Sequence, residues 1–298
     1  MAEYKIYTVD AFADAPFKGN QAAIVPVPVG KPLTDEVMLK LAAEMNISET
    51  AYIMPLDSGD NSVDENEVFA SQSRFGLRWF TPTVEALLCG HATLAAAHVL
   101  FFELGNTSPE LVFDTLSGAL VVRRQENGYL QMTFPMDRPL PVVPVTQDIQ
   151  CVVKGVLGKD YREDMEVSIS PRLRYMVVYD PELTAKDVVE LRPNITSEVY
   201  AAGERENVSL VIVTARGGNG RDFDSRCFGP WCGIDEDPVT GSAHTVLAPF
   251  WNKKLDKTLF SAFQCSQRGG DLSVEIVGDS LVAVGGRAVV IIRGYLTL

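Results

Sequence analysis

Basic residues, histidines and cysteines are scarce in this sequence, and each shortage excludes a class of function. The chain carries 26 Lys and Arg against 39 Asp and Glu, a formal net charge of -13. Nucleic-acid binders carry basic patches and anionic membrane surfaces attract cations, so we expect neither as a partner. A small anionic metabolite is still compatible with this charge, because salt screens charges more than about 10 Å away.

The spacing of the cysteines and histidines gives no sign of a metal site or a disulfide framework. The five cysteines are scattered, and no pair is spaced as C-x-x-C. With only three histidines, at 91, 98 and 244, a zinc cage is not expected. Reduced thiols, the lack of a secretory signal after Met1 and the lack of about 20 consecutive apolar residues lead us to expect a cytoplasmic protein without a membrane span.

One stretch, residues 78–100, organises what the sequence does contain. It reads RWFTPTVEALLCGHATLAAAHVL, with a strand-like start, a Thr-Pro turn and an almost wholly apolar helix over 92–100. A helix that is apolar all round is buried, so its first amide groups lie unpaired inside the protein. With the positive end of the helix dipole they form an anion site, and Gly90 lets a ligand approach the backbone closely.

The same plan occurs a second time in the sequence. Arg-x-Phe-x-Pro over 78–82 recurs over 226–230, and each copy is followed by a glycine, Gly90 or Gly241, that leads into small and apolar residues. We therefore expect an internal duplication with two halves, residues 1–134 and 135–298, each offering a buried helix start. A length of 298 residues also suggests two domains of about 150 residues. The last strands could cross back to the first half.

Local patterns predict short strands around one buried helix in each half. Strands are expected over 4–9, 22–27, 50–54, 68–80, 111–114, 119–124, 129–134, 173–178, 208–214, 223–228, 257–264, 272–277, 281–284 and 288–296. Helices are expected over 34–45, 149–157 and 185–191, with an acidic surface loop over 57–67. This content is α+β, with mixed sheets wrapped on a central helix, and differs from a doubly wound nucleotide fold.

The candidate catalytic residues each have a plain structural interpretation as well. Glu49, where a helix gives way to a strand, is either a solvated carboxylate or one aimed into a cleft. Cys89 and His91 suggest a thiol nucleophile that the helix dipole would acidify, but two groups so close in sequence rarely point at one reacting atom. His91 is therefore expected to contact a ligand, and His98 to be a core histidine with its hydrogen bonds satisfied.

The acidic pair Glu236 and Asp237 is open to two interpretations. It fits a turn followed by a helix cap, with Thr240 or Ser242 supplying the capping oxygen. It also fits a carboxylate, Asp237, beside a bound ligand, since two adjacent carboxylates raise each other's pKa and suit acid–base work. His244, just beyond the second helix start, is ambiguous.

Five motifs stand in order along nearly the whole chain. They are Gly19-Asn20-x-Ala22-Ala23, Met45-Asn46-x-Ser48-Glu49-Thr50, Arg78-Trp79-Phe80-Thr81-Pro82, residues 88–95 (LCGHATLA) and residues 236–244 (EDPVTGSAH). Together they resemble the PhzF-like family of phenazine biosynthesis proteins. The resemblance implies a diaminopimelate-epimerase-like α+β fold of two pseudo-symmetric halves, each a barrel-like mixed sheet around a central buried helix, with the site in the cleft between them.

The resemblance also implies a cofactor-independent isomerase that forms a homodimer. Glu49 takes the place of the family's catalytic carboxylate, which carries a proton from one substrate carbon to another. We accordingly expect Glu49, Asp237 and His91 to be catalytic. The residues expected to bind the substrate are Asn20, Cys89, Gly90, Thr240, Gly241 and Ser242.

Related epimerases use two cysteines on opposite sides of the reacting carbon. Here Cys89 matches the first position, but Thr240 matches the second, and a hydroxyl cannot replace a thiolate as base, so two-thiol racemisation is not expected. The sequence departs from the family pattern at Gln21 and Leu87. It also has Pro249 inside the second buried helix, where a proline should end or kink the helix near Ala248.

The sequence thus predicts an isomerase that moves a proton on a small carboxylate-bearing metabolite. The two helix starts would bind the carboxylate, and Glu49, once desolvated, would have a pKa raised toward neutrality. The alternatives are a non-catalytic protein-interaction module that keeps the fold, and an enzyme whose nucleophile is the Cys89 thiol.

Overall fold

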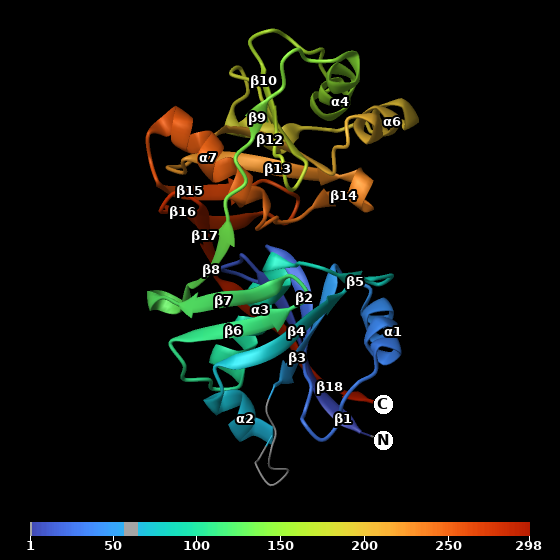
Figure 1. Ribbon diagram of the computed structural model, residues 1–298, viewed down its shortest axis with the longest axis vertical. Coiled ribbons are helices and arrows are strands. Elements are labelled where there is room, and N and C mark those ends of the chain that lie inside the picture. Colours follow the sequence, from blue (N-terminus) through green and yellow to red (C-terminus); the bar gives the residue numbers. More distant parts are fainter. Residues whose placement is uncertain (1, 57–64) are drawn as a thin grey trace. The chain divides into compact units, whose positions relative to one another are not determined.

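The computed structural model describes residues 2–56 and 65–298, which form two compact units (Figure 1). Unit 1 comprises residues 1–133 and 285–298, and unit 2 comprises residues 134–284. Residues 57–64 of the predicted acidic loop lie outside the described residues. No helix in the described part of the chain is long and apolar enough to cross a membrane.

Unit 1 contains a mixed sheet whose order follows from its strand pairings. β1 pairs antiparallel with β18 and β2, β2 parallel with β3, β3 antiparallel with β4, β4 parallel with β6, and β6, β7 and β8 follow antiparallel. The strands are β1 (Glu3–Ala11), β2 (Asn20–Pro26), β3 (Glu49–Pro55), β4 (Arg74–Phe80), β5 (Glu85–Ala86), β6 (Glu110–Thr115), β7 (Gly118–Arg124), β8 (Leu130–Pro135) and β18 (Ala288–Thr297). The chain ends therefore lie side by side in unit 1, where β1 meets β18 (Figure 1).

Two helices pack on this sheet as their sequence patterns predict. α3 (Gly90–His98) is buried from His91 to Ala97, contacts β1, β2 and β3, and continues as the π-helical turn η1 (Val99–Glu103). α1 (Asp35–Met45) begins at Thr34, whose hydroxyl accepts from the Val37 amide. A short 3-10 turn, η2 (Glu126–Gly128), joins β7 to β8.

The strand predicted over 68–80 is wrong in its first part. Residues 65–71 form the helix α2 (Glu65–Ser71), and β4 begins only at Arg74. The side-chain amide of Asn106 donates to the carbonyls of Phe69 and Gln72 at 2.7 and 2.6 Å, which satisfies acceptors at the end of this helix. Phe69 of α2 stacks on Phe75 of β4. The sequence pattern read these two neighbouring elements as a single strand.

Unit 2 repeats the alternation of antiparallel and parallel pairings. β10 pairs antiparallel with β11, β11 parallel with β12, β12 antiparallel with β13, β13 parallel with β15, and β15 antiparallel with β16. The strands are β9 (Leu140–Pro141), β10 (Glu166–Ile169), β11 (Tyr175–Tyr179), β12 (Leu210–Arg216), β13 (Phe223–Gly229), β14 (Ile234–Asp237), β15 (Leu259–Gln264), β16 (Gly270–Val277) and β17 (Leu281–Gly286). Internal duplication stays a prediction about the origin of the two halves.

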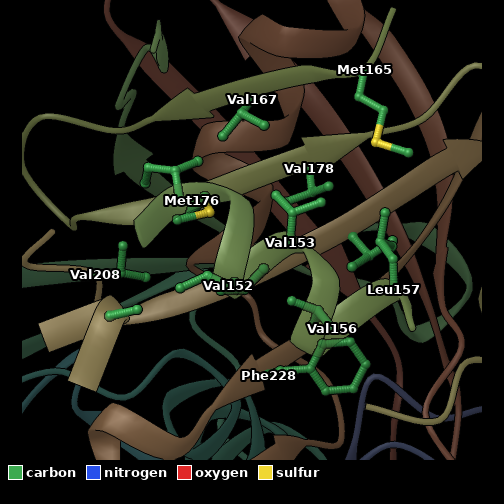
Figure 2. Close-up of a cluster of buried hydrophobic side chains, with 14 of the residues drawn as sticks. Val152, Val153, Val156, Leu157, Met165, Val167, Met176, Val178, Val208 and Phe228 are labelled. Atoms are coloured by element: carbon green, nitrogen blue, oxygen red, sulfur yellow. The ribbon is translucent and has the colours of Figure 1, made fainter. Parts of the chain in front are cut away.

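Helix α4 (Gln147–Leu157) covers one part of the unit 2 sheet through an apolar cluster. Figure 2 shows Val152, Val153, Val156 and Leu157 of α4 gathered with residues of β11 and β13. Burying aliphatic side chains of this size stabilises the fold by about 1.5–3 kcal/mol each. Strand β10 and helix α6 (Ser197–Arg205) join the same region but were not predicted, whereas α5 (Ala185–Glu190) was.

The sequence predicts that Pro249 ends or kinks the second buried helix, but the helix does not end there. α7 (Ala243–Leu255) continues for six residues beyond Pro249, and a short 3-10 turn, η3 (Pro230–Cys232), precedes it in the chain. A proline removes the amide that would bond the carbonyl four residues earlier. That carbonyl, of Thr245, accepts a hydrogen bond from the backbone N–H of Asp137 at 3.2 Å instead. The proline therefore leaves no orphaned acceptor at Thr245.

Candidate functional site

The most chemically distinctive cluster in unit 1 joins Glu49, Cys89 and His91. Oε2 of Glu49 lies 2.9 Å from Nε2 of His91, and both side chains are almost completely removed from solvent. Sγ of Cys89 lies 3.5 Å from Nδ1 and 3.9 Å from Nε2 of the same imidazole. Apart from this contact with His91, Oε2 of Glu49 has no hydrogen-bond partner among the described residues.

The fold brings these residues together from two elements. Glu49 is the first residue of β3 and stands opposite Ala22 in the parallel pairing of β2 with β3. Cys89 is the N-cap of α3, which begins at Gly90 without any side-chain cap. Asn20 starts β2, and its Oδ1 accepts from the Ser48 hydroxyl at 3.2 Å, which ties it to the residue before Glu49. The start of α3 and the start of β3 therefore lie next to each other.

Each pKa in the cluster follows from burial and neighbouring charge. Burial raises the pKa of Glu49, but the His91 charge and hydrogen bonds from His91 and Cys89 outweigh this and hold it below its ordinary value. Burial lowers the pKa of His91, but the Glu49 carboxylate and the hydrogen bonds to Cys89 and Glu49 outweigh this and raise it well above its ordinary value. Burial and the charge of Glu49 raise the pKa of the Cys89 thiol.

At neutral pH the cluster is therefore a carboxylate, an imidazolium and a protonated thiol. Because the Cys89 thiol keeps its proton, the charge that holds the proton on His91 comes from Glu49. Two expectations from the sequence are wrong in this respect. The pKa of Glu49 is lowered because His91 lies against it, and the pKa of Cys89 is raised because burial outweighs the stabilisation expected from the helix dipole.

In unit 2, a buried glutamine organises the turn that leads into α7. Oε1 of Gln264 accepts from the Thr240 amide at 2.8 Å, and its Nε2 donates to the Asp237 carbonyl at 2.7 Å and to Oγ1 of Thr240 at 3.2 Å. The Thr240 hydroxyl donates to Oδ2 of Asp237 at 2.5 Å. The orientation of the Asp237 carboxylate is thus fixed by Thr240, which is fixed in turn by Gln264.

Ser242 and His244 occupy the first turn of α7, just after Gly241. The hydroxyls of Ser242 and Tyr175 lie 3.1 Å apart, and burial raises the pKa of Tyr175 to about 12. Nδ1 of His244 lies 2.9 Å from the Thr240 carbonyl, and burial lowers its pKa to about 4, so this imidazole is neutral. No side-chain oxygen caps α7, and the amides of His244 and Thr245 donate instead to the carbonyls of Gly241 and Ser242 at 3.1 Å.

The adjacent carboxylates at 236 and 237 have separate partners. Glu236 forms a two-pronged ion pair with Arg226, with both N···O distances at 2.7 Å. Its negative charge is thus matched by a guanidinium, which differs from the mutual repulsion that the sequence suggested. The repeated arginine of the sequence motif has the same kind of partner in unit 1, where Arg78 pairs with Glu85 at 2.7 Å.

The structure groups the candidate residues within each unit. Asn20, Glu49, Cys89, Gly90 and His91 belong to unit 1, and Asp237, Thr240, Gly241 and Ser242 belong to unit 2. Sequence reasoning missed two polar residues that hold the second group, Gln264 on β15 and Tyr175 on β11. Their only sequence signal is a polar group at the end of a mostly apolar strand.

His98 also differs from its prediction. It lies two turns after His91 on α3 and stacks on Phe102, with ring centroids 4.8 Å apart. Its Nδ1 has no hydrogen-bond partner among the described residues, so its hydrogen bonds are not all satisfied as expected. Burial lowers its pKa to about 4, which makes it a neutral aromatic contact.

Comparisons with known proteins agree over the full length of the chain. The profile of the phenazine biosynthesis-like protein family (PhzC-PhzF) matches residues 9–294. Phenazine biosynthesis-like domain-containing protein 2 of Mus musculus is 38% identical over 298 residues, 98% of each chain. An uncharacterized isomerase of Pseudomonas aeruginosa is 42% identical over 296 residues, covering 99% of this chain and all of the relative.

The solved structures extend this likeness to the fold. The crystal structure of a phenazine biosynthesis protein of the PhzF family from Enterococcus faecalis covers both chains completely, with a TM-score of 0.80 and 35% identity. The α+β fold of the diaminopimelate-epimerase type that the sequence predicted is confirmed.

Proposed function

Because the chain belongs to the phenazine biosynthesis-like (PhzC-PhzF) protein family, we propose that it is a cofactor-independent isomerase acting on a small carboxylate-bearing metabolite. The relative from Pseudomonas aeruginosa, at 42% identity, carries the name of an isomerase. The reaction proposed is the transfer of a proton from one substrate carbon to another.

The observation that carries the proposal is the buried contact between Glu49 and His91. A base must be ionised before its substrate arrives, and the lowered pKa of Glu49 keeps it so. A group that stabilises developing negative charge must be able to donate a proton or hydrogen bond, and the raised pKa of His91 keeps its ring protonated. The two states suit general base and electrophile at one position.

In the proposed reaction, substrate binding changes the partners of this pair. The His91 ring donates to a substrate oxygen, where negative charge develops as the C–H bond breaks. Glu49 then loses the stabilisation that lowered its pKa while remaining buried, so its basicity rises. It takes the proton from one carbon and returns it to another, and no proton or electron is gained or lost overall.

We assign carboxylate binding to the helix starts. The positive end of α3, just after Cys89, has no side-chain cap, and the start of α7 after Gly241 and Ser242 has none either. Asp237, oriented by Thr240, is proposed as a second polar contact to the substrate. Asn20, tied to Ser48, is proposed as a further substrate contact.

The thiol alternative has less support than the carboxylate. A nucleophilic cysteine acts as the thiolate, and burial raises the pKa of Cys89, which keeps it protonated at neutral pH. A non-catalytic interaction module would have no need for a buried carboxylate paired with an imidazolium. Both alternatives make predictions that the following experiment separates.

The test is proton exchange in D₂O with pools of small dienoic, aromatic, amino and hydroxy acids. We expect the wild-type protein to convert one class of acid, with a new NMR spectrum or deuterium at the reacting carbon. Glu49→Gln should lower this rate by about 10²–10⁴-fold, the usual contribution of general acid–base catalysis. Glu44→Gln, at an exposed position of α1, is the matched control and should keep full activity.

Two outcomes would contradict the carboxylate mechanism. If Glu49→Gln turns over as fast as the wild type, Glu49 is not the proton carrier. If Cys89→Ser loses all activity while Glu49→Gln keeps it, the thiol alternative is correct. Circular dichroism of each variant establishes that the comparison is between folded proteins.

A further inference from the structure

The polar groups of Thr240, which the sequence predicts to bind the substrate, all have partners within unit 2. Its backbone amide donates to Oε1 of Gln264 at 2.8 Å, and its carbonyl lies 2.9 Å from Nδ1 of His244. Its hydroxyl donates to Oδ2 of Asp237 at 2.5 Å, so both of its donors are used. We propose that Thr240 and Gln264 are positioning residues of the reaction, which act on the substrate only through Asp237. The proposal rests on the proposed function.

The directions of the hydrogen bonds among Gln264, Thr240 and Asp237, here called the Gln264 network, follow from their chemistry. The Thr240 amide can only donate and the Asp237 carbonyl can only accept. The Gln264 side chain must therefore present its oxygen to the first and its nitrogen to the second. The same nitrogen lies 3.2 Å from the Thr240 hydroxyl, which accepts from it. The hydroxyl proton is thereby directed at the Asp237 carboxylate.

The thiol of Cys227 is a competing acceptor for the hydroxyl proton of Thr240. Burial raises the pKa of this thiol, so it keeps its proton at neutral pH and is only a weak acceptor. A hydrogen bond to an ionised group is about twice as strong as one between neutral groups. The hydroxyl proton of Thr240 therefore stays with Asp237.

Strand β13 brings Gln264 close to Asp237. Asp237, the last residue of β14, stands opposite Cys227 of β13, and Gln264, the last residue of β15, stands opposite Ser225. Two residues along a strand span about 7 Å, a separation that a glutamine side chain can cross. Because Gln264 is completely buried, its side chain does not exchange these partners for solvent.

The Gln264 network determines how Asp237 is presented. A carboxylate turns easily about its last bond, because that torsion has broad minima. The Thr240 hydroxyl holds one of the two oxygens and so restricts this rotation. A displacement of about 1 Å at a reacting group can lower a rate by about 10²-fold. Loss of the hydroxyl should therefore lower kcat more than it raises KM, since the other contacts to the substrate remain.

The first test compares two substitutions of Thr240 on the acid that the wild-type protein converts. Thr240→Val has a similar shape without the hydroxyl, and its kcat should fall by about 10²-fold. Thr240→Ser keeps the hydroxyl and should stay close to the wild-type rate. In an Asp237→Asn background, Thr240→Val should lower the rate no further, because residues that act as a unit are not additive. An equal loss in both backgrounds would overturn the proposal, since Thr240 would then act on the substrate without Asp237.

Thr214→Val is the matched control in unit 2. The buried Thr214 hydroxyl donates to the Asp224 carbonyl at 2.8 Å and accepts from Nε1 of Trp251 at 3.0 Å. The variant thus loses a buried hydroxyl that both donates and accepts, but its partners lie outside the turn at 237–240. It should lose stability and keep the wild-type rate. A rate loss as large as that of Thr240→Val would overturn the positioning role, because any buried hydroxyl would then have the same effect.

Two further measurements need no substrate. In urea unfolding, Gln264→Leu and Thr240→Val together should cost less than the sum of their separate losses, because they remove shared hydrogen bonds. Crystal structures should show the Asp237 carboxylate in the same position in Thr240→Ser as in the wild type, and displaced in Thr240→Val. Additive losses, or a carboxylate that keeps its position in Thr240→Val, would overturn the proposal. Thr240→Ala provides a second variant if the valine form does not fold.

Failure of the positioning role and failure of the proposed function give different results. A rate that falls in Glu49→Gln but is unchanged in Thr240→Val would support the isomerase and overturn the positioning role. A protein that converts none of the acids, but whose Asp237 carboxylate moves in Thr240→Val and not in Thr240→Ser, would support the Gln264 network and overturn the proposed function.

Discussion

Nε2 of His91 lies 2.9 Å from Oε2 of Glu49, and the two residues reach this separation from the start of a helix and the start of a strand. Neither group would hold its charge in so buried a position alone, because burial raises the pKa of a carboxyl and lowers that of an imidazole. Each makes the charged form of the other stable. The chemistry of unit 1 therefore depends on a pair, and its removal should affect both rate and stability.

Replacing His91 should change both the rate and the pH at which the rate falls. His91→Asn removes the donor to the developing negative charge, and we expect turnover to fall by about 10²–10³-fold. It also removes the charge that holds the pKa of Glu49 down, so the acidic limb of the rate profile should move to higher pH. The measurement is kcat/KM against pH for the wild type and the variant, because this ratio reports the pKa values of the free enzyme.

His98→Asn is the control for that experiment, because His98 lies on the same helix but is a neutral contact to Phe102. Its acidic limb should stay where the wild type has it. An unmoved acidic limb in His91→Asn would mean that Glu49 and His91 are not coupled in the working enzyme.

The ion pair also gives the stability of the protein a defined pH dependence. The folded pKa of Glu49 lies below its ordinary value of 4.5, so its contribution is present above that pH and is lost as the pH falls through the folded value. The folded pKa of His91 lies above its ordinary value of 6.5, so its contribution is complete below that pH and is lost as the pH rises through the folded value. The pair should therefore stabilise most between about pH 4.5 and 6.5.

Urea unfolding of the wild type and of the Glu49→Gln/His91→Asn double variant checks this window. The difference in unfolding free energy should be largest inside it and should shrink toward both acid and alkaline pH. A difference that does not vary with pH would show that the pair is not ionised in the folded protein.

The sequence supplied most of the elements and the identity of the candidate residues, because both depend on local patterns. An apolar run after Cys89-Gly90-His91 was enough to predict a buried helix start, and five ordered motifs were enough to predict the fold. It could not supply the direction of the Glu49 pKa shift, because that direction depends on a neighbour brought close by packing between β3 and α3. Local sequence patterns give no information about the distance between two elements of the fold.

The residues that support the site were missed for the same reason. Gln264 makes three hydrogen bonds to the turn at 237–240, but it lies on β15, beyond the whole of helix α7. Helix α2 was read as part of a strand because the local pattern of residues 68–80 does not show where the helix ends, and that end is satisfied by Asn106, a residue from a distant segment. In both cases the decisive hydrogen bond is non-local.

Gln264 should contribute to stability through the turn that it holds. Gln264→Leu has a similar size but leaves the buried Thr240 amide and the partly buried Asp237 carbonyl without their partner. We expect a loss of about 1–3 kcal/mol for each buried group left unpaired. Urea unfolding measures this change in the free energy of unfolding. The control Gln125→Ala, at an exposed site, should change the free energy of unfolding by less than about 0.5 kcal/mol.

Gln264→Glu separates hydrogen bonding from simple packing. It keeps an acceptor for the Thr240 amide but removes the amide donor and places a second carboxylate near Asp237. It should be at least as destabilising as Gln264→Leu, and a glutamate variant as stable as the wild type would show that the donor side of Gln264 is dispensable.

Pro249 provides a test of how a long helix accommodates a proline. A proline in a helix interior is about 3 kcal/mol less favourable than alanine, partly because a carbonyl one turn earlier loses its partner. In α7 that carbonyl, of Thr245, already accepts from the Asp137 amide. Pro249→Ala should therefore stabilise the protein by much less than 3 kcal/mol, because the backbone amide that alanine restores would bond a carbonyl that already has a donor.

Lys154→Pro in α4 is the matched opposite, since Lys154 is an exposed interior position of a regular helix. The carbonyl freed there has no second donor, and we expect the free energy of unfolding, measured in urea, to fall by about 3 kcal/mol or more. A gain of similar size in Pro249→Ala would show that the contact from Asp137 does not compensate for the proline. A small change in Pro249→Ala beside a large loss in Lys154→Pro would show that it does, because the two substitutions differ in whether the freed carbonyl has another donor.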